Sequence, residues 1–410
     1  MVGSRAMRLG LRGILAYSAA SVGTGAFYAF NNFVISLLLK PLGAPDLVIG
    51  LLSSTRSIEG AVVQPTVGAW SDRIWTRLGR RRPFMAVAIP LSTAFFLLSP
   101  FATGLLELAI AIFLFSFFFN VAVDPYAALL PDVTPADQRG TVSGVSNAVQ
   151  LVSQVAFLVV IAFASASGTI PVWAYVLCGG VLLASFALTI AGVPEPHALA
   201  ERAVRTPLRT YLQTLTENVL ALRYLGTIFV YQFGLNAVLP YLTLFITQDI
   251  GESNEIALLL AALTLLVTAA SAIVFGAVSD RVGARGVLGA GWALLALAAI
   301  GGTLIHGLAQ TVAVVLLAGV GNGAATAVKW PLLTLLIPQE KTGIYAGLSA
   351  AADSIAIPLS VFVASELFLP TLGYRGIFAM LAINIVLALA LFLALVRVPR
   401  SQAPLATPAQ

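Results

Sequence analysis

The sequence predicts an all-α membrane protein whose twelve helices form two pseudo-symmetric repeats of six. Apolar residues make up 59% of the 410 residues and charged residues only 10%, against roughly 25% charged in a soluble domain. The chain contains twelve apolar stretches, and a membrane-crossing helix needs about 20 mostly apolar residues. Of the 22 Lys and Arg, two lie inside these stretches and two on one side of them, which leaves 18 on the other side. This bias orients a membrane protein with its basic side in the cytoplasm.

The apolar stretches divide the chain into two sets of six. We place them near 12–39, 45–71, 84–102, 105–131, 140–167, 171–193, 224–248, 256–279, 286–306, 309–336, 342–368 and 376–397. The first stretch continues to Leu39, which favours an uncleaved helix over a secretory signal. We therefore expect a six-helix bundle over 1–193, a cytoplasmic linker over 194–223, a second bundle over 224–400 and a disordered tail over 401–410. Both termini are expected on the cytoplasmic side of the plasma (bacterial inner) membrane.

The two sets repeat one another in sequence. Offsets between matching positions stay between 203 and 208 along the chain. The matches are Gly68–Arg73 with Gly276–Arg281, Pro125 and Pro131 with Pro331 and Pro338, Gly140, Gly144 and Ser146 with Gly343, Gly347 and Ser349, and Val193-Pro194 with Val398-Pro399. Four matches in the same order indicate a duplicated bundle.

The loop between the second and third stretches carries a basic cluster behind a Gly-x-x-x-Asp-Arg motif. An acidic side chain there can accept hydrogen bonds from neighbouring Arg or from helix-end amides, so the loop could hold the cytoplasmic ends of the halves together. For the Arg-rich part, membrane topology alone is an equal explanation. The candidate gate residues are Gly68, Asp72, Arg73, Arg80, Arg81, Arg82, Asp280 and Arg281.

These motifs resemble those of the major facilitator transporters. Over about residues 1–140 the resemblance is to the sucrose–proton symporters and the wider glycoside–cation symporter branch. It rests on Leu42-Gly43-Ala44-Pro45, on Val63–Arg73 with the Gly-Arg-Arg-Arg-Pro-Phe that follows, and on Pro125–Asp132. The resemblance implies proton-coupled sugar transport, with the substrate bound near the membrane midplane between halves that rock about it.

The chain departs from the sucrose symporters at three positions. Asp46 stands where they carry a His, Ser116 where they carry an Asp, and Ala127 where they carry an Arg. A serine hydroxyl does not exchange a proton near neutral pH. Proton coupling therefore has to use a carboxylate elsewhere in the chain. Sucrose itself as the substrate is put in doubt.

Five ionisable residues lie inside the apolar stretches. Each is roughly 7 to 16 residues from its cytoplasmic end, about 10–24 Å deep at 1.5 Å per residue. Charges at such depth are costly unless they are paired or face water, and are functional candidates. The proton-coupling candidates are Asp124, Asp353 and Glu59, and their charge partners are Lys329 and Arg56.

Two pairings are open for these charges. Asp124 and Lys329 are near-equivalents in the two repeats, and we expect them to approach each other directly or through water or substrate. Arg56 can pair with Glu59 on one helix face or with Asp353 across the halves. Three negative and two positive charges leave one carboxylate in excess, which favours a proton as the coupling ion.

Amide and aromatic side chains within the stretches suit a hydroxylated solute, because an amide both donates and accepts hydrogen bonds. Hydrogen bonding between helices is the alternative explanation for the amides. The substrate-binding candidates are Asn31, Asn32, Asn120, Tyr126, Asn147, Gln150, Gln154, Tyr231, Gln232, Asn236 and Trp330.

The pattern as a whole predicts a secondary transporter that moves a sugar or glycoside by proton symport. The alternative is a proton-coupled antiporter that exports cationic or amphipathic molecules. Cys178 is the sole cysteine and the two histidines are far apart, which argues against a disulfide or a metal site. We expect no cofactor, no nucleic-acid partner and no enzymatic activity, and a monomer that works in the lipid bilayer.

Overall fold

The computed structural model describes residues 8–54, 74–135, 138–195, 218–338 and 342–396, with Val63, Thr66, Val67, Trp70 and Ser71. Over these residues the chain is helical and contains no β-strand. The prediction of an all-α protein is confirmed.

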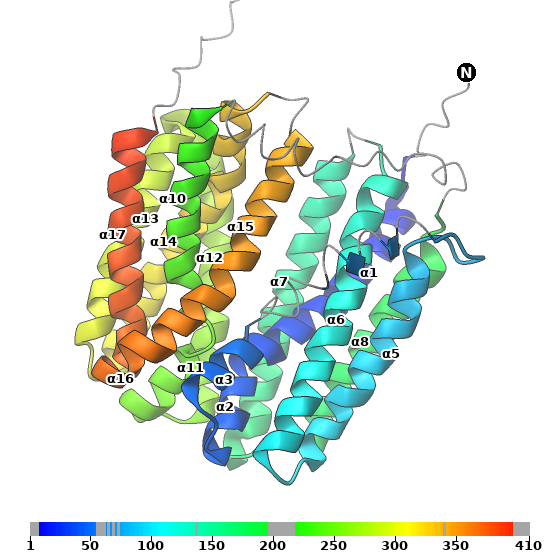
Figure 1. The fold of residues 1–410 in the computed structure, drawn as a ribbon, viewed down its shortest axis with the longest axis horizontal. Helices are drawn as coiled ribbons and strands as arrows, with labels where there is room; N and C mark the ends of the chain where they lie inside the picture. The colour runs from blue at the N-terminus through cyan, green and yellow to red at the C-terminus, as the bar shows by residue number, and fades with distance from the viewer. Residues whose placement is uncertain are drawn as a thin grey trace, which may run out of the picture.

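The helices form two groups that lie side by side in Figure 1. The first group, which we call the N-half, consists of α1 (Leu11–Phe33), α2 (Ile35–Leu39), α3 (Asp46–Leu52), α5 (Arg82–Leu98), α6 (Leu105–Val133), α7 (Arg139–Ala164) and α8 (Val172–Gly192). The second group, the C-half, consists of α10 (Val219–Asn236), α11 (Leu242–Leu244), α12 (Asn254–Val282), α13 (Ala284–Leu304), α14 (Leu308–Leu336), α15 (Thr342–Val363), α16 (Leu369–Leu372) and α17 (Gly376–Leu395).

Helix α1 begins and α17 ends at the same end of the molecule, which we call the inner end (Figure 1). The short helices α2, α3, α11 and α16 lie at the opposite, outer end. Short 3₁₀ and π segments complete the turns there: η1 (Lys40–Leu42), η5 (Phe245–Asp249), η7 (Ala364–Phe368) and η8 (Gly373–Arg375).

Among the described residues, eight helices are long and apolar enough to cross a membrane, and nine if the bent pair 11–33 and 35–42 counts as one span. One of the eight, Ser354–Leu395, runs through two of the predicted spans. The predicted span 224–248 is divided between α10, α11 and η5. The predicted span 45–71 lies largely outside the described residues. These differences account for the step from twelve predicted spans to eight or nine.

Glycines bring α14 close to its neighbours in the C-half. A Cβ on Gly321 would lie 2.7 Å from the Gly291 carbonyl oxygen of α13, and one on Gly323 would lie 2.5 Å from the Thr268 carbonyl oxygen of α12. Small residues at such crossings let helix backbones approach in a membrane, where no hydrophobic effect drives helices together. This close packing sets the positions of the polar side chains that α14 carries.

The packing predicts different effects for the same substitution at two glycines of the C-half. Gly321→Ala places a methyl group against backbone atoms and should lower the free energy of unfolding by about 1–3 kcal/mol. Gly289→Ala in α13 meets nothing within 4 Å and should be neutral or slightly stabilising. Thermal unfolding in detergent measures both, and equal midpoints would contradict the close approach of α13 and α14.

Candidate functional site

Asp46, at the start of α3, joins the two halves at the outer end. Its Oδ1 accepts hydrogen bonds from Lys40 Nζ at 2.9 Å and from the Tyr374 hydroxyl of the C-half at 2.8 Å. Its backbone oxygen accepts from the Tyr241 hydroxyl, also of the C-half, at 2.8 Å. Lys40 Nζ lies 5.2 Å from the centre of the Tyr374 ring, within range of a cation–π contact. We call Lys40, Asp46, Tyr241 and Tyr374 the outer cluster.

A second cross-half contact lies beside this cluster. The Ser36 and Thr243 hydroxyls, both fully buried, are 2.9 Å apart. Every hydrogen bond that the structure shows between described residues of the two halves is at this outer end. Nearby in the C-half, Asp249 Oδ2 accepts from the Arg375 amide at 3.1 Å, and burial raises the pKa of the Asp249 carboxyl. The halves are therefore closed against each other at the outer end.

The predicted Arg cluster lies at the inner end, in the N-half. Arg80 forms a two-point ion pair with Asp132 at the end of α6, with Nη2 to Oδ1 at 2.6 Å and Nε to Oδ2 at 3.1 Å. Arg81 Nε donates to the same carboxylate at 3.3 Å, and its Nη1 donates to the Ser71 hydroxyl. Two-point Arg–carboxylate pairs are strong and directional. These arginines therefore fix the loop to the end of α6, in addition to contributing to the positive charge of the inner end.

Glu195, just after α8, binds the backbone of the same segment. The amides of Arg80, Arg81 and Arg82 all donate to its carboxylate, each at 2.9 Å for the shortest contact. This is an anion held at a helix N-terminus, where the unpaired amides and the helix dipole favour negative charge. Gly79 adopts φ 105°, and a Cβ there would lie 2.6 Å from the carboxylate. We call Arg80, Arg81, Asp132 and Glu195 the inner cluster.

The repeated motif of the C-half has a different environment. Asp280 and Arg281, at the end of α12, are exposed and form no ion pair with any described residue. By repeat offsets of 203 to 208, Asp132 corresponds to Gln339 or Glu340 and Glu195 to Arg400, so the C-half lacks a counterpart of Glu195 in sequence. The other gate candidates, Gly68, Asp72 and Arg73, lie outside the described residues.

The charges predicted at mid-membrane depth are only partly described. Asp124 of α6 and Lys329 of α14 are both half-buried, and the structure shows no ion pair between them. The Lys329 backbone oxygen accepts from the Tyr224 hydroxyl at 2.6 Å. Arg56 and Glu59 lie outside the described residues. Asp353 lies in α15, and its side chain is outside the described part of the structure. The pairing of these charges stays a prediction.

Two of the predicted amides meet in the N-half. Asn31 of α1 is fully buried, and its Nδ2 donates to the Leu52 carbonyl at 3.2 Å and contacts the Ser116 hydroxyl at 3.5 Å. Asn120 donates to the Ser116 carbonyl at 3.0 Å, while its buried Oδ1 has no hydrogen-bond partner. At the position where the sucrose symporters carry an Asp, this chain therefore has a neutral serine between two amides.

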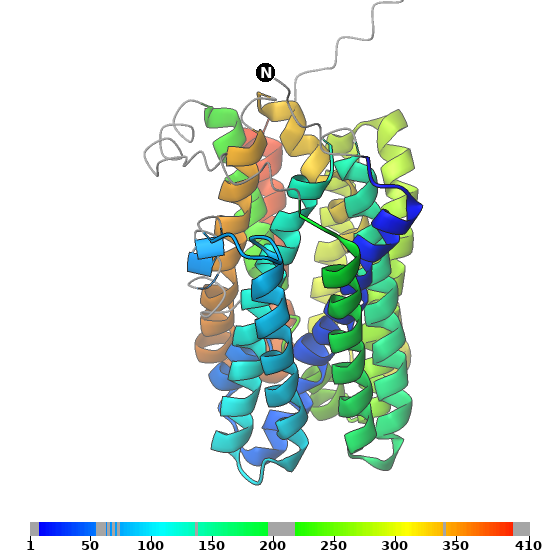
Figure 2. The same ribbon diagram turned by 90° about the vertical axis from the view of Figure 1, so that its right-hand side faces the viewer.

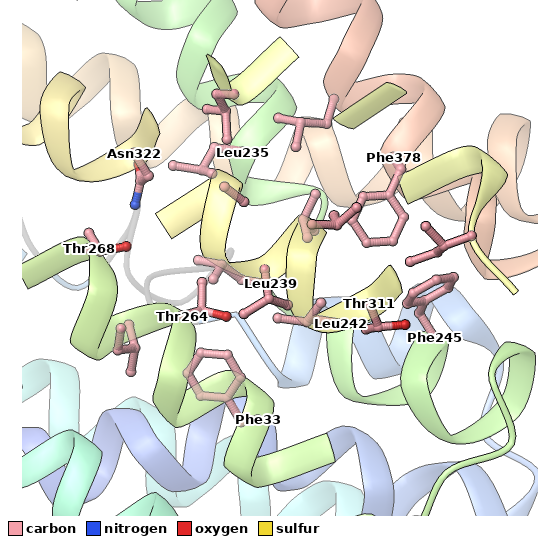
Figure 3. A pocket seen from close by; sticks show the side chains of 18 residues that line it. Phe33, Leu235, Leu239, Leu242, Phe245, Thr264, Thr268, Thr311, Asn322 and Phe378 are labelled. Carbon is pink, nitrogen blue, oxygen red and sulfur yellow. The ribbon is translucent and has the colours of Figure 1, made fainter. Parts of the chain in front are cut away.

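A second polar group lies in the C-half. The Tyr231 hydroxyl donates to Asn322 Oδ1 at 2.6 Å, and the Tyr231 ring stacks on Trp292. Asn322 and the hydroxyl of Thr268 line a largely apolar cavity of about 210 Å³ (Figure 3). The buried Thr268 Oγ1 and the nearby α10 group Asn236 Nδ2 have no hydrogen-bond partner. Phe33 of α1 lines the same cavity from the N-half.

The other candidates are scattered. Tyr126 stacks on Tyr17, and its hydroxyl bonds to Ser21 and to the Tyr17 carbonyl, so it packs within the N-half. Asn147 and Trp330 are exposed, Gln154 is buried, and Asn32, Gln150 and Gln232 are half-buried.

Several residues of these groups were missed by the sequence reasoning. Asp132 and Glu195 were visible only as charges at stretch ends, because their partners are distant in sequence. Asn322 had a signal, since it is the one amide among the glycines of 319–323. Asp46, Tyr241 and Tyr374 come from three turns, whose meeting depends on the tertiary arrangement.

The comparisons with known proteins identify the family. The Major Facilitator Superfamily sequence model matches residues 16–230 and 224–410, so the chain belongs to this superfamily of membrane transporters. It has the membrane-spanning helices expected of such a protein.

Three known proteins illustrate what the chain is similar to. A human proton-associated sugar transporter A (Homo sapiens) is 42% identical over 60 residues, 15% of this chain and 8% of the relative. A sucrose transport protein of Arabidopsis thaliana is 29% identical over 149 residues, 31% of this chain and 25% of the relative. The match therefore spans well under half the length of these relatives. The crystal structure of a D-xylose–proton symporter has a TM-score of 0.72 at 16% identity, covering 94% of this chain and 97% of that one. This last likeness concerns the fold.

The outer cluster predicts that Tyr374→Phe loosens the outer closure. A hydrogen bond to a charged group contributes about 1.5–3 kcal/mol, reduced here because Asp46 is partly exposed. We expect about a five-fold faster reaction of a cysteine placed at Asn32 with a membrane-impermeant maleimide added at the outer side. The native Cys178 is buried and gives a low background.

Tyr175→Phe is the matched control, because Tyr175 is buried within the N-half and lies away from the outer cluster. An unchanged labelling rate in Tyr374→Phe, or an equal increase in both variants, would remove the cluster from the closure.

Proposed function

We propose that this transporter moves a sugar or glycoside together with a proton. The observation that carries the proposal is a pair of amides near the middle of two corresponding helices of the repeats. Asn120 and Asn322 each lie at the middle of a 29-residue helix, α6 and α14. Substrate sites of this superfamily lie near the midplane where the repeats meet, and amides suit hydroxyl groups because they donate and accept. The sugar transporters among the relatives support the same solute class.

The coupling groups in this proposal lie on the same helix faces as the amides. Asp124 follows Asn120 by four residues and Lys329 follows Asn322 by seven, spacings that put side chains on one face of a helix. A solute held by the amides would therefore sit one or two turns from the Asp124 carboxylate. In general, burial favours the protonated form of a carboxylic acid and a close cation favours the ionised form. A change in their separation as the halves rock would load and release the proton.

The contacts at the outer end indicate to which side of the membrane the described conformation is closed. If the inner end is cytoplasmic, as the Lys and Arg distribution implies, the described state is closed to the outside. One proton that moves down 100 mV supplies about 2.3 kcal/mol, which sustains about fifty-fold accumulation of a neutral solute.

Uptake into proteoliposomes tests the proposed function. An inward proton gradient should drive accumulation of at least one member of a panel of labelled monosaccharides, disaccharides and glucosides, and a protonophore should abolish it. A lipophilic cation serves as the control solute. If the cation alone moves, and against the proton gradient, the antiporter replaces the symporter.

Asp124→Asn tests the proton pathway separately. The amide keeps the shape of the side chain but cannot exchange a proton, so uphill accumulation should fall to the level of simple equilibration. Downhill exchange of labelled against unlabelled solute should persist, which shows that the variant is folded and binds solute. Uphill transport at the wild-type rate would exclude Asp124 from coupling.

A further inference from the structure

A groove runs along the outer face of the N-half between α5 and α8, which lie side by side in Figure 2. Its volume is about 740 Å³. On α8 the groove is lined by small residues three or four positions apart: Gly180, Ala184, Ala187 and Ala191. Side chains of α5 such as Ile89 form the opposite wall, where Pro90 also lies. Leu183, Phe186 and Ile190 of α8 also line the groove, which is thus an open hollow with a mostly apolar lining.

The surface around this groove faces the membrane. Val87 of α5 and Leu188 of α8 are each 63% exposed, and both helices are long and apolar enough to cross a membrane. Apolar side chains so exposed on membrane-spanning helices are covered by lipid acyl chains. The groove therefore opens into the bilayer and not into the path of the solute.

Arg82 lies at the inner end of the groove, together with Leu78. Its backbone amide donates to Glu195, but its guanidinium forms no ion pair with any described residue. The Nε of this guanidinium is buried and has no hydrogen-bond partner. Arg80 and Arg81, by contrast, both bind Asp132. Arg82 therefore differs from Arg80 and Arg81 in having no carboxylate partner among the described residues.

We propose that the groove binds an anionic phospholipid, with its phosphate on Arg82 and one acyl chain along α8. Arginine presents paired donors that match phosphate oxygens. Arg82 is half-buried, and a phosphate there would provide a partner for its one buried, unpaired donor, Nε. Basic pockets between membrane helices on the cytoplasmic side are known to hold anionic headgroups. The small residues of α8 leave room for an acyl chain, which a soluble anion such as inorganic phosphate does not have.

The bound lipid would lie next to the inner cluster. The Arg82 amide and the Arg80 and Arg81 amides share the Glu195 carboxylate, so a phosphate on Arg82 adds a further contact to the same short segment. The lipid would therefore stabilise the inner end of the N-half. The site is independent of the solute and of the coupling ion.

Thermal unfolding of the full chain in nanodiscs tests this site. Wild-type protein should unfold at a higher temperature in phosphatidylglycerol than in phosphatidylcholine of the same chain length, and native mass spectrometry should retain about one phosphatidylglycerol. Arg82→Gln should lose the difference between the two lipids. Ala184→Phe, which fills the groove, should lose the retained lipid while keeping every arginine.

Arg77→Gln is the matched control, because Arg77 is an exposed arginine of the same loop that does not line the groove. It should keep both the lipid preference and the retained lipid. Inorganic phosphate added to protein in phosphatidylcholine should not raise the unfolding temperature. Equal losses in Arg77→Gln and Arg82→Gln, or a full effect of inorganic phosphate, would overturn the lipid site.

Discussion

The hydrogen bonds of Asp46 hold the outer end of this transporter closed. One carboxylate accepts from Lys40 of its own half and Tyr374 of the other, and its backbone accepts from Tyr241. Alternating access requires that the contacts at one end be strong enough to close it and weak enough to release. A few hydrogen bonds, made by the partly exposed Asp46 to the buried Tyr241 and Tyr374, are suited to both conditions. The resembling sucrose symporters carry a His at this position, so the closure rests on a feature of this chain.

The inner end is organised differently in the two halves. In the N-half, Asp132 and Glu195 hold Arg80 and Arg81 by side chain and backbone, which makes the end of α6, the end of α8 and the start of α5 one unit. In the C-half, Arg400 stands at the sequence position of Glu195 and Gln339 or Glu340 at that of Asp132, and Asp280 and Arg281 are exposed. The repeats thus share a motif and differ in its partners. Among the described residues, Arg80 and Arg81 of the N-half are thus held by a carboxylate, whereas Asp280 and Arg281 of the C-half form no ion pair.

The sequence was sufficient for the fold because composition, charge bias and repeats are properties of long segments. The membrane and family assignment, the helical class and the importance of Arg80 to Arg82 could all be read from it. The hydrogen-bond partners could not be read from the sequence, because Asp132, Glu195 and Tyr374 lie 52, 115 and 328 positions from theirs. The partners of Tyr126 were also not predictable: its hydroxyl bonds to Ser21 and to the Tyr17 carbonyl within the N-half, and its role in binding stays a prediction. Residue type alone does not reveal which face of a helix meets the solute.

The central claim, that Asp46 closes the outer end of a transporter whose halves rock, is tested most directly by distances across that end. Spin labels at Leu42 and Leu372, which are 40% and 52% exposed and lie in different halves, report the separation by double electron–electron resonance. We expect one dominant short distance in the wild type. In Asp46→Asn we expect a second, longer distance with a larger population. The same single distance in both proteins would contradict the central claim.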